Sequence, residues 1–272
     1  MIAPAPAAAS SNIVSNPWYP PLAASSNILS NPRYPPLAEA ARHLADAIAV
    51  HPNQVRKPYF SILPPYGRSA GIGSGGLGGF PLSGESFGIL STGNVELANH
   101  KNNSQSTTRK LGGPRVRGAR DVTILRMGLR VPKNATCLSI RFRFLTEEFP
   151  EFVGSPFNDF FIAELNGTSW DAGSREDPTI TAPRNFAFDS QGKVISVNAA
   201  GAATVTRKRA KGTTYDGGTR ILRASTKVTP GRHNLFLSLA DQKDRLYDST
   251  VLLDRLTLDR RKPCRPGVAA GN

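Results

Sequence analysis

The feature that most constrains this fold is an alternation of apolar and polar residues near the middle of the chain. Leu138, Ile140, Phe142 and Phe144 alternate with serine and arginine. Because successive side chains of a strand point to opposite faces, this period of two predicts a half-buried strand. Comparable alternations recur along the chain, and the 22 Pro and 25 Gly residues favour many turns and few long helices.

A loop rich in carboxylates follows this strand, and a second acidic segment lies near residue 244. Carboxylates crowded into one loop repel one another unless they are solvated, paired with arginine or bridged by a hard cation. We therefore predict a Ca²⁺ site. Its candidate ligands are Glu147, Glu148, Glu151, Asn158, Asp159, Asp241 and Asp244. The alternative, in which these acids pair with the abundant arginines and cap turns, stays open.

The acidic loop also carries a family resemblance. Its sequence is Thr-Glu-Glu-Phe-Pro-Glu-Phe-Val-Gly-Ser-Pro-Phe-Asn-Asp over residues 146–159, and further matching segments lie at 84–93, 185–192, 213–217 and 240–254. Together these segments resemble the choice-of-anchor L domain of bacterial cell-surface and secreted proteins. The resemblance implies an extracellular β-rich module with no catalytic mechanism that can be transferred residue by residue.

The strand patterns and the resemblance together predict an all-β fold, an antiparallel β-sandwich of jelly-roll type. Residues 1–36 are predicted to be a disordered leader, and residues 9–38 contain a 15-residue tandem duplication. One short helix is predicted over residues 37–50, because apolar residues recur there on one face. The sandwich domain is predicted to span residues 37–262, with a tail at 263–272.

Positive charge is concentrated in the second part of the chain. Residues 101–272 hold 29 Lys and Arg against 16 Asp and Glu, a net of +13 of the total +14. Such a surface attracts polyanions, including nucleic acid, teichoic acid and acidic polysaccharide. If the strand patterns at 122–131 and 138–144 pair, they place four arginines on one outward face: Arg126, Arg130, Arg141 and Arg143. A solvated face without a dedicated partner is the alternative.

Cys137 and Cys264 are the two cysteines. One begins the central strand pattern and the other follows the last one. We predict that they form a disulfide that fastens the C-terminal tail to the edge of the sandwich in an oxidising compartment. Unpaired buried thiols are the alternative.

The predicted function is that of a non-catalytic binding or adhesion module, secreted or at the cell surface, stabilised by Ca²⁺ and binding a glycan or an anionic wall polymer. No nucleophile-elbow, zinc-protease or Cys/His pattern is present. No apolar run is long enough to span a bilayer, and the first ten residues lack the basic and apolar regions of a signal peptide. A basic protein that binds nucleic acid and a glycosidase-like enzyme that uses the acidic loop remain the two alternatives.

Overall fold

The computed structural model describes residues 13–14, 36–100, 111–243 and 245–271. The predicted leader and its duplicated segment lie almost wholly outside these residues. The exceptions are residues 36–38 and the two-residue strand β1 (Ile13–Val14), which pairs with β3 (Ala70–Ser74).

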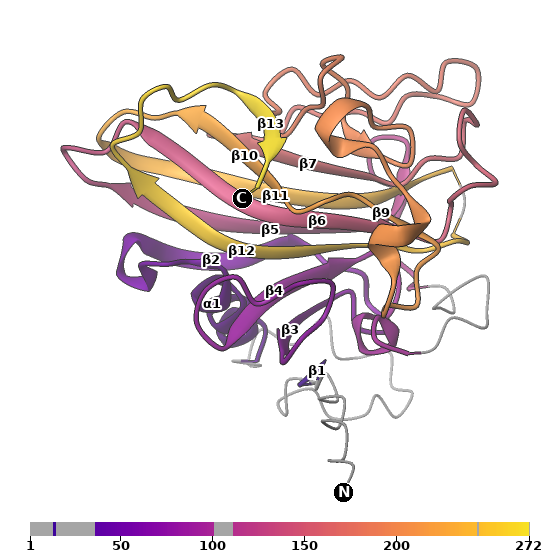
Figure 1. Ribbon diagram of the computed structural model, residues 1–272, viewed down its shortest axis with the longest axis horizontal. Coiled ribbons are helices and arrows are strands. Elements are labelled where there is room, and N and C mark those ends of the chain that lie inside the picture. The colour runs from indigo at the N-terminus through magenta and orange to yellow at the C-terminus, as the bar shows by residue number, and fades with distance from the viewer. Residues whose placement is uncertain (1–12, 15–35, 101–110, 244, 272) are drawn as a thin grey trace, which may run out of the picture.

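Two antiparallel sheets face each other and form a sandwich (Figure 1). The first sheet has the spatial order β1, β3, β4 (Ser86–Ser91), β12 (Ser249–Asp259), β6 (Cys137–Thr146), β10 (Leu222–Lys227) and β13 (Gly267–Ala270), with β9 (Gly217–Gly218) beside the end of β6. The second has the order β2 (Val55–Ile62), β5 (Ala119–Val131), β11 (Gly231–Gln242), β7 (Phe160–Leu165) and β8 (Ile195–Ser196). The connections among the described residues contain four short 3-10 turns, at Pro52–Gln54, Val95–Leu97, Gly201–Ala203 and Arg207–Ala210.

The strand pairing is that of a jelly roll. Strand β4 pairs with β12, β5 with β11 and β6 with β10, so early strands pair with late ones. Strands β4, β5, β6 and β7 alternate between the two sheets, and so do β10, β11 and β12. The predicted fold class, an antiparallel β-sandwich of jelly-roll type, is confirmed.

The core lies between the sheets and follows from the alternation in β6. Leu138, Ile140, Phe142 and Phe144 are all fully buried in one cluster with apolar side chains of the second sheet. The ring of Phe142 lies 4.9 Å from that of Phe161 on β7, centroid to centroid. The polar residues between them face the other side of the sheet, as a half-buried strand requires.

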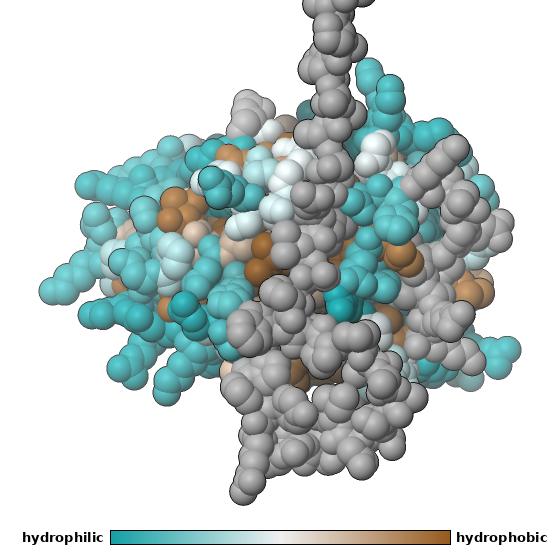
Figure 2. Space-filling view, turned by 90° about the horizontal axis from the view of Figure 1, so that it is seen from below, coloured by the Kyte–Doolittle hydropathy of each residue, from teal (hydrophilic) through white to brown (hydrophobic). Residues whose placement is uncertain are grey.

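On the outer face of each sheet, loops pack against the strands and bury a smaller apolar cluster. On the second sheet this cluster contains Trp170, which is fully buried and packs against Phe160 with ring centroids 5.5 Å apart. The indole N–H of Trp170 donates to Ser238 Oγ at 3.2 Å. Seen from below, the surface is mainly hydrophilic, with apolar residues in small separate groups (Figure 2).

The helix α1 (Pro36–Ile48) closes one side of the sandwich, between β2 of one sheet and β4 of the other. Leu44 and Ile48 bury its apolar face, which agrees with the helix predicted over residues 37–50. The close approach depends on Gly88 in β4, because a Cβ at that position would lie 2.5 Å from Ile48 Cγ1. Across the described residues, no helix has the length and apolar character needed to cross a membrane.

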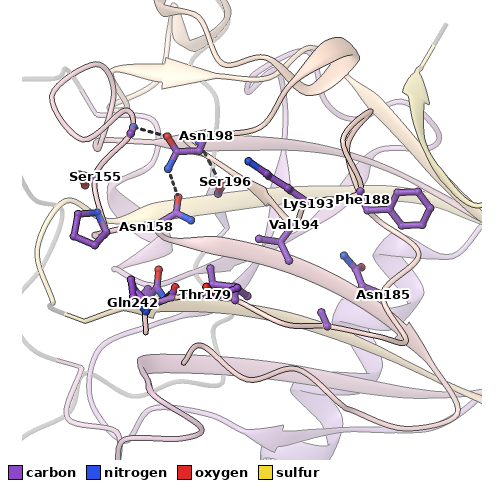
Figure 3. Close-up of a pocket in the computed structure, with 16 residues that line it drawn as sticks. Ser155, Asn158, Thr179, Asn185, Phe188, Lys193, Val194, Ser196, Asn198 and Gln242 are labelled. Atoms are coloured by element: carbon purple, nitrogen blue, oxygen red, sulfur yellow. Dashed lines mark hydrogen bonds between the residues drawn. The ribbon is translucent and has the colours of Figure 1, made fainter. Parts of the chain in front are cut away.

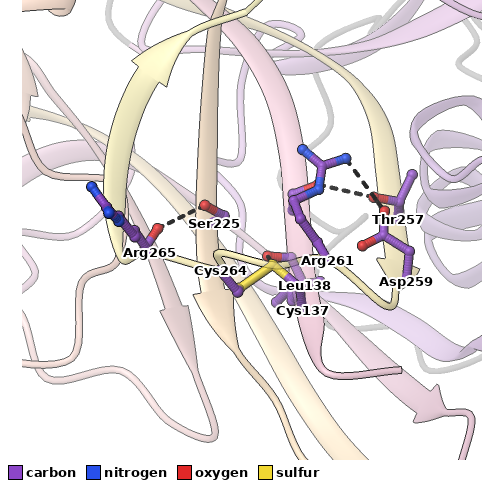
Figure 4. Close-up of a disulfide and its surroundings, with 9 residues drawn as sticks. Cys137, Leu138, Ser225, Thr257, Asp259, Arg261, Cys264 and Arg265 are labelled. Atoms are coloured by element: carbon purple, nitrogen blue, oxygen red, sulfur yellow. Dashed lines mark hydrogen bonds and ion pairs between the residues drawn. A yellow bond between two sulfur atoms is a disulfide. The ribbon is translucent and has the colours of Figure 1, made fainter. Parts of the chain in front are cut away.

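The predicted disulfide between Cys137 and Cys264 is present, with an S–S distance of 2.06 Å and a Cα–Cα distance of 5.7 Å. It ties the start of β6 to the segment that follows β12 (Figure 4). Strand β13 lies within the segment predicted to be a tail and pairs with β10 at the edge of the first sheet. The chain after the last long strand is therefore fixed by both a covalent bond and a strand pairing.

Candidate functional site

One end of the sandwich gathers polar residues from both sheets. Strands β4, β6 and β11 end there, and β5, β7 and β12 begin there. Asn158 and Gln242 point into a surface pocket, whereas their chain neighbours Asp159 and Asp241 are buried on the other side. This arrangement follows from the alternation of side chains along extended backbone. Two different sites therefore lie back to back.

The first of these sites is a pocket of about 690 Å³, which we call the amide pocket (Figure 3). It lies between the segments 154–158, 178–185 and 188–198, with Gln242 contributed by β11. Four of its lining residues carry side-chain amides: Asn158, Asn185, Asn198 and Gln242. Thr179, Ser155 and Ser196 add hydroxyl groups.

Internal hydrogen bonds fix the orientation of the amides. Asn198 Oδ1 accepts from the backbone N–H of Gly154 at 2.6 Å, and Asn198 Nδ2 donates to Asn158 Oδ1 at 3.3 Å. Gln242 Nε2 donates to two backbone carbonyls, at 2.7 and 2.6 Å. No described residue accepts a hydrogen bond from Asn158 Nδ2. This donor is therefore available to a bound molecule.

Apolar groups and a single charge complete the amide pocket. Val194, Ile180 and Phe188 supply apolar surface, and Lys193 is its one charged residue among the described residues that line it. A concave site that combines apolar walls with a few oriented polar groups is typical of small-molecule recognition. Amides that both donate and accept suit ligand hydroxyls, and the near absence of charge favours a neutral ligand.

The second site is a set of buried carboxylates at this end of the sandwich, which we call the acidic cluster. Its members are between 1% and 3% exposed: Glu147, Glu148, Asp159, Asp241 and Asp248. Glu148 Oε2 accepts from the backbone N–H of Asp159 at 3.0 Å, and Glu147 Oε2 accepts from that of Asp248 at 3.1 Å. The cluster unites the acidic loop with the start of β12.

Asp159 lies at the electrostatic centre of this cluster. Its Oδ2 accepts from Thr92 Oγ1 at 2.9 Å, whereas its buried Oδ1 has no hydrogen-bond partner in the described part of the chain. Burial raises the pKa of Asp159 well above its usual value, and the nearby carboxylates of Asp241 and Glu148 raise it further. A buried anion in such surroundings must bind a proton or a cation.

Asp121 at the start of β5 adjoins the acidic cluster. Burial raises its pKa to about 6, and the carboxylate of Asp248 adds to this, while Arg245 and Arg120 oppose it. The Arg245 Nε atom lies 3.8 Å from Asp121 Oδ2. This one ion pair does not offset the loss of hydration.

The structure separates the predicted Ca²⁺ ligands. Glu148, Asp159 and Asp241 come together in the acidic cluster, with Glu147 beside them. Glu151 is exposed and Asn158 faces the amide pocket, while Asp244 lies outside the described residues. As the described side chains stand, no three Asp, Glu, His or Cys residues form a group that could hold a metal ion. Calcium therefore stays a prediction.

The predicted stripe of four arginines is not formed. Arg126 and Arg130 lie on β5 of the second sheet, whereas Arg141 and Arg143 lie on β6 of the first. The prediction was wrong because a jelly roll sends consecutive strands to opposite sheets. Arg126 instead lies over the ring of Tyr59, with 4.9 Å from its guanidinium carbon to the ring centroid.

The amide pocket was missed by sequence reasoning, apart from Asn158, which was assigned to the metal site. Its amides come from segments up to 84 residues apart, between Asn158 and Gln242. Asparagine and glutamine in turns are common, so composition gives no signal for their convergence. Only the pairing of β11 with β7, which brings the two segments together, identifies the site.

Comparison with known proteins gives a family match in sequence. The model of the choice-of-anchor L domain family matches residues 67–259. No curated protein sequence matches the chain. Similar solved structures include TmCBM61 in complex with beta-1,4-galactotriose, at 10% identity and a TM-score of 0.29, covering 71% of this chain and 83% of that one. Tailspike protein 4 of bacteriophage CBA120, in its enzymatically active domain, also has 10% identity and a TM-score of 0.29, with 74% of this chain and 19% of that one covered. TM-scores this low relate neither structure's ligand to this chain.

Proposed function

The chain belongs to the choice-of-anchor L domain family, and from this premise we propose that it is a non-catalytic binding module of a cell-surface or secreted protein that holds a neutral glycan segment in the amide pocket. The family favours a surface or secreted location. The pocket supplies the ligand chemistry, because its oriented amides match sugar hydroxyls and its apolar walls match the C–H faces of a sugar ring.

The observation that carries this proposal is the arrangement of Asn158 and Asn198. Asn198 is held from both sides, and it in turn orients Asn158 with Nδ2 left for a ligand. A donor fixed before binding loses little conformational entropy when the ligand arrives. Binding requires no chemistry on the sugar, so the carboxylates of the acidic cluster take no catalytic part.

A glycan array at physiological salt, followed by calorimetry with a retained glycan, tests this proposal. The variant Asn158→Ala removes the free donor and should weaken binding about tenfold, which corresponds to ~1.4 kcal/mol. Asn53→Ala, at an exposed position outside the pocket, is the matched control and should bind as the wild type does. Wild-type affinity in Asn158→Ala, with an unchanged melting temperature, would contradict the proposal, as would an array that retains no glycan.

The acidic cluster supports a second part of the proposal, which is that Ca²⁺ stabilises this end of the sandwich. The ligands would be the carboxylates of Glu148, Asp159 and Asp241, which would have to turn toward one common point, because as they stand no three described carboxylates form a group that could hold a metal ion. Ca²⁺ prefers several oxygen ligands, and Asp159 Oδ1 is buried without a described partner. Bound Ca²⁺ would offset the repulsion among these buried carboxylates. Since Asp159 and Asp241 adjoin pocket residues in the chain, the ion would also fix one wall of the amide pocket.

Thermal melts in EGTA and in millimolar Ca²⁺ test the metal separately from the glycan. Binding to the native state alone should stabilise the wild type by about 2.7 kcal/mol at a hundredfold excess over the dissociation constant. Asp159→Asn should abolish this response, whereas Glu151→Gln, at an exposed position in the same loop, should keep it. Equal wild-type melting temperatures with and without Ca²⁺ would mean that protons hold the cluster together.

A further inference from the structure

The opposite end of the sandwich contains a larger hollow of about 1050 Å³, which we call the basic pocket. It lies between the end of β7, the β10–β11 connection and the segment 261–265 that follows β12. Four of its lining residues are permanently cationic: Lys227, Arg261, Lys262 and Arg265. No Asp or Glu is among the described residues that line it.

Three of these cations are free to meet a ligand. Lys227, Lys262 and Arg265 are exposed, and none forms an ion pair with a described residue. Arg261 alone is paired within the described part of the chain, with its Nη2 3.4 Å from Asp259 Oδ2. The positive charge of the pocket is therefore largely uncompensated.

His233 lies in the wall of this pocket and contacts two of its segments. Its Nε2 lies 2.9 Å from the carbonyl oxygen of Thr229, and its Nδ1 lies 3.0 Å from Asn166 Nδ2. The ring thus fastens the β10–β11 connection to the end of β7.

The cationic segment is held rigidly. Cys264 lies in the pocket wall and is bonded to Cys137, and Ser225 Oγ donates to the carbonyl oxygen of Arg265 at 2.8 Å (Figure 4). A disulfide, a hydrogen bond and the β10–β13 pairing therefore fix the backbone of the segment that carries Arg261, Lys262 and Arg265. Such preorganisation is expected of a binding site and unnecessary for a solvated tail.

Further arginines continue the basic pocket along the outer face of the first sheet. Arg141 on β6 is directly opposite Arg223 on β10. Burial lowers the pKa of Arg141, and the positive charges of Arg255, Arg223 and Arg261 lower it further, with Asp254 opposing them. Asp254 on β12 lies opposite Arg141 on its other side and offsets part of this positive charge, and a bound anion would offset more of it.

We propose that the basic pocket and the adjoining arginines bind a phosphate-bearing polymer of the polyol-phosphate or sugar-phosphate type. Several cations at fixed spacing suit repeated phosphates, and the row of arginines extends the site beyond a single anion. Nucleic acid also carries repeated phosphates, but single-stranded binders stack bases on aromatic rings. No Phe, Tyr or Trp is among the described lining residues of this pocket. The site is separate from the amide pocket and would serve a second ligand.

Binding of a short poly(glycerol phosphate) at several salt concentrations tests this proposal, with polyglutamate and oligo-dT of equal charge as comparison probes. The pocket variant is Lys227→Ser/Lys262→Ser/Arg265→Ser. Its matched control is Arg207→Ser/Lys208→Ser/Lys211→Ser, which removes the same charge from an exposed turn elsewhere. The pocket variant should lose at least tenfold in affinity for the phosphate polymer. In a plot of the logarithm of the affinity against the logarithm of the salt concentration, the slope should also become shallower by about one for each phosphate that the variant no longer neutralises.

The outcomes separate a built site from general attraction between charges. A large loss in the pocket variant with a small loss in the control supports the proposal, provided that polyglutamate binds more weakly than the phosphate polymer. Equal losses in the two triple variants would overturn it, because they would show that only net charge matters. Failure of the wild type to bind the polymer would overturn it as well. Tighter binding of oligo-dT, abolished in the pocket variant, would assign the pocket to nucleic acid instead.

Discussion

Asp121→Asn should stabilise the protein at neutral pH, because the wild-type carboxylate is buried at a cost. Asp121 is 2% exposed, its Oδ1 has no hydrogen-bond partner among the described residues, and its pKa is raised from 3.8 to about 6. Asparagine keeps the shape of the side chain and is neutral at every pH. The substitution therefore removes the cost of ionising this group in the folded protein.

The sign and size of the effect follow from linkage between protonation and folding. Between pH 3.8 and about 6 the folded state holds a proton on Asp121 that the unfolded state has released, so stability falls as the pH rises through this window. The full interval corresponds to about 3 kcal/mol. The ion pair with Arg245, at 3.8 Å, is removed in the variant and reduces the gain. At pH 7.5 the expected gain is therefore up to about 3 kcal/mol, or ~6–10 °C in melting temperature.

The assay is thermal and urea unfolding of both proteins from pH 4 to 7.5, in EGTA so that bound metal does not contribute. The difference between wild type and Asp121→Asn isolates this residue, because the other buried carboxylates titrate in both proteins. It should be small near pH 4 and grow towards pH 7. Asp177→Asn is the control, at an exposed site where hydrogen bonds from the side chain and backbone of Thr179 lower the pKa of the carboxylate, so any effect of this variant should have the opposite sign. If Asp121→Asn is the less stable protein at pH 7.5, Arg245 and Arg120 outweigh the burial and the reasoning is refuted.

Three further predictions concern stability. Gly88→Ala should destabilise by about 1–3 kcal/mol, because the new methyl group meets helix α1, while Gly76→Ala, with open space around it, should be close to neutral in the same urea titration. Replacing Cys137 and Cys264 by serine should lower the free energy of unfolding by up to about 5 kcal/mol, because the disulfide closes a loop of 127 residues. Reducing agent should change the melting temperature of the wild type but not that of this variant. Asp254 Oδ2 accepts from the backbone N–H groups of Leu82 and Ser83, in the loop before β4, at 2.6 and 3.1 Å. Asp254→Ala removes this acceptor and should lower the free energy of unfolding by about 1–3 kcal/mol. An unchanged urea midpoint would show that water replaces the carboxylate.

The local features of the fold were predictable where one residue pattern decided them. The alternation from Leu138 to Phe144 predicted both the strand β6 and its buried face, and the spacing of Leu44 and Ile48 predicted helix α1. Each of these predictions depends only on which way neighbouring side chains point. The positions of Cys137 and Cys264 at strand boundaries likewise agreed with the bridge that forms.

The arrangement of distant residues was not predictable in the same way. The alternation shows that Arg126 and Arg141 face outward from their strands, but not that the two strands belong to different sheets. Within the acidic loop, the sequence indicated a dense group of polar ligands but not that Asn158 and Asp159, one residue apart, serve separate sites. Their separation depends on where the backbone becomes extended at the start of β7, which is set by its pairing with β11.

The central position of β12 has a consequence for the order in which the chain can fold during synthesis. This strand is the last long one in the sequence, yet it lies between β4 and β6 in the middle of the first sheet. A nascent chain that ends before Ser249 would have this sheet in two separate pieces, with the apolar face of helix α1 and the inner face of β6 only partly covered. Closure must join strands more than 150 residues apart, as in the pairing of Leu253 with Gly88, and such distant pairings form slowly. The ribosome must therefore release nearly the whole domain before the sandwich can close, and until then the chain remains open to chaperones, to proteases and to any machinery that handles unfolded polypeptide.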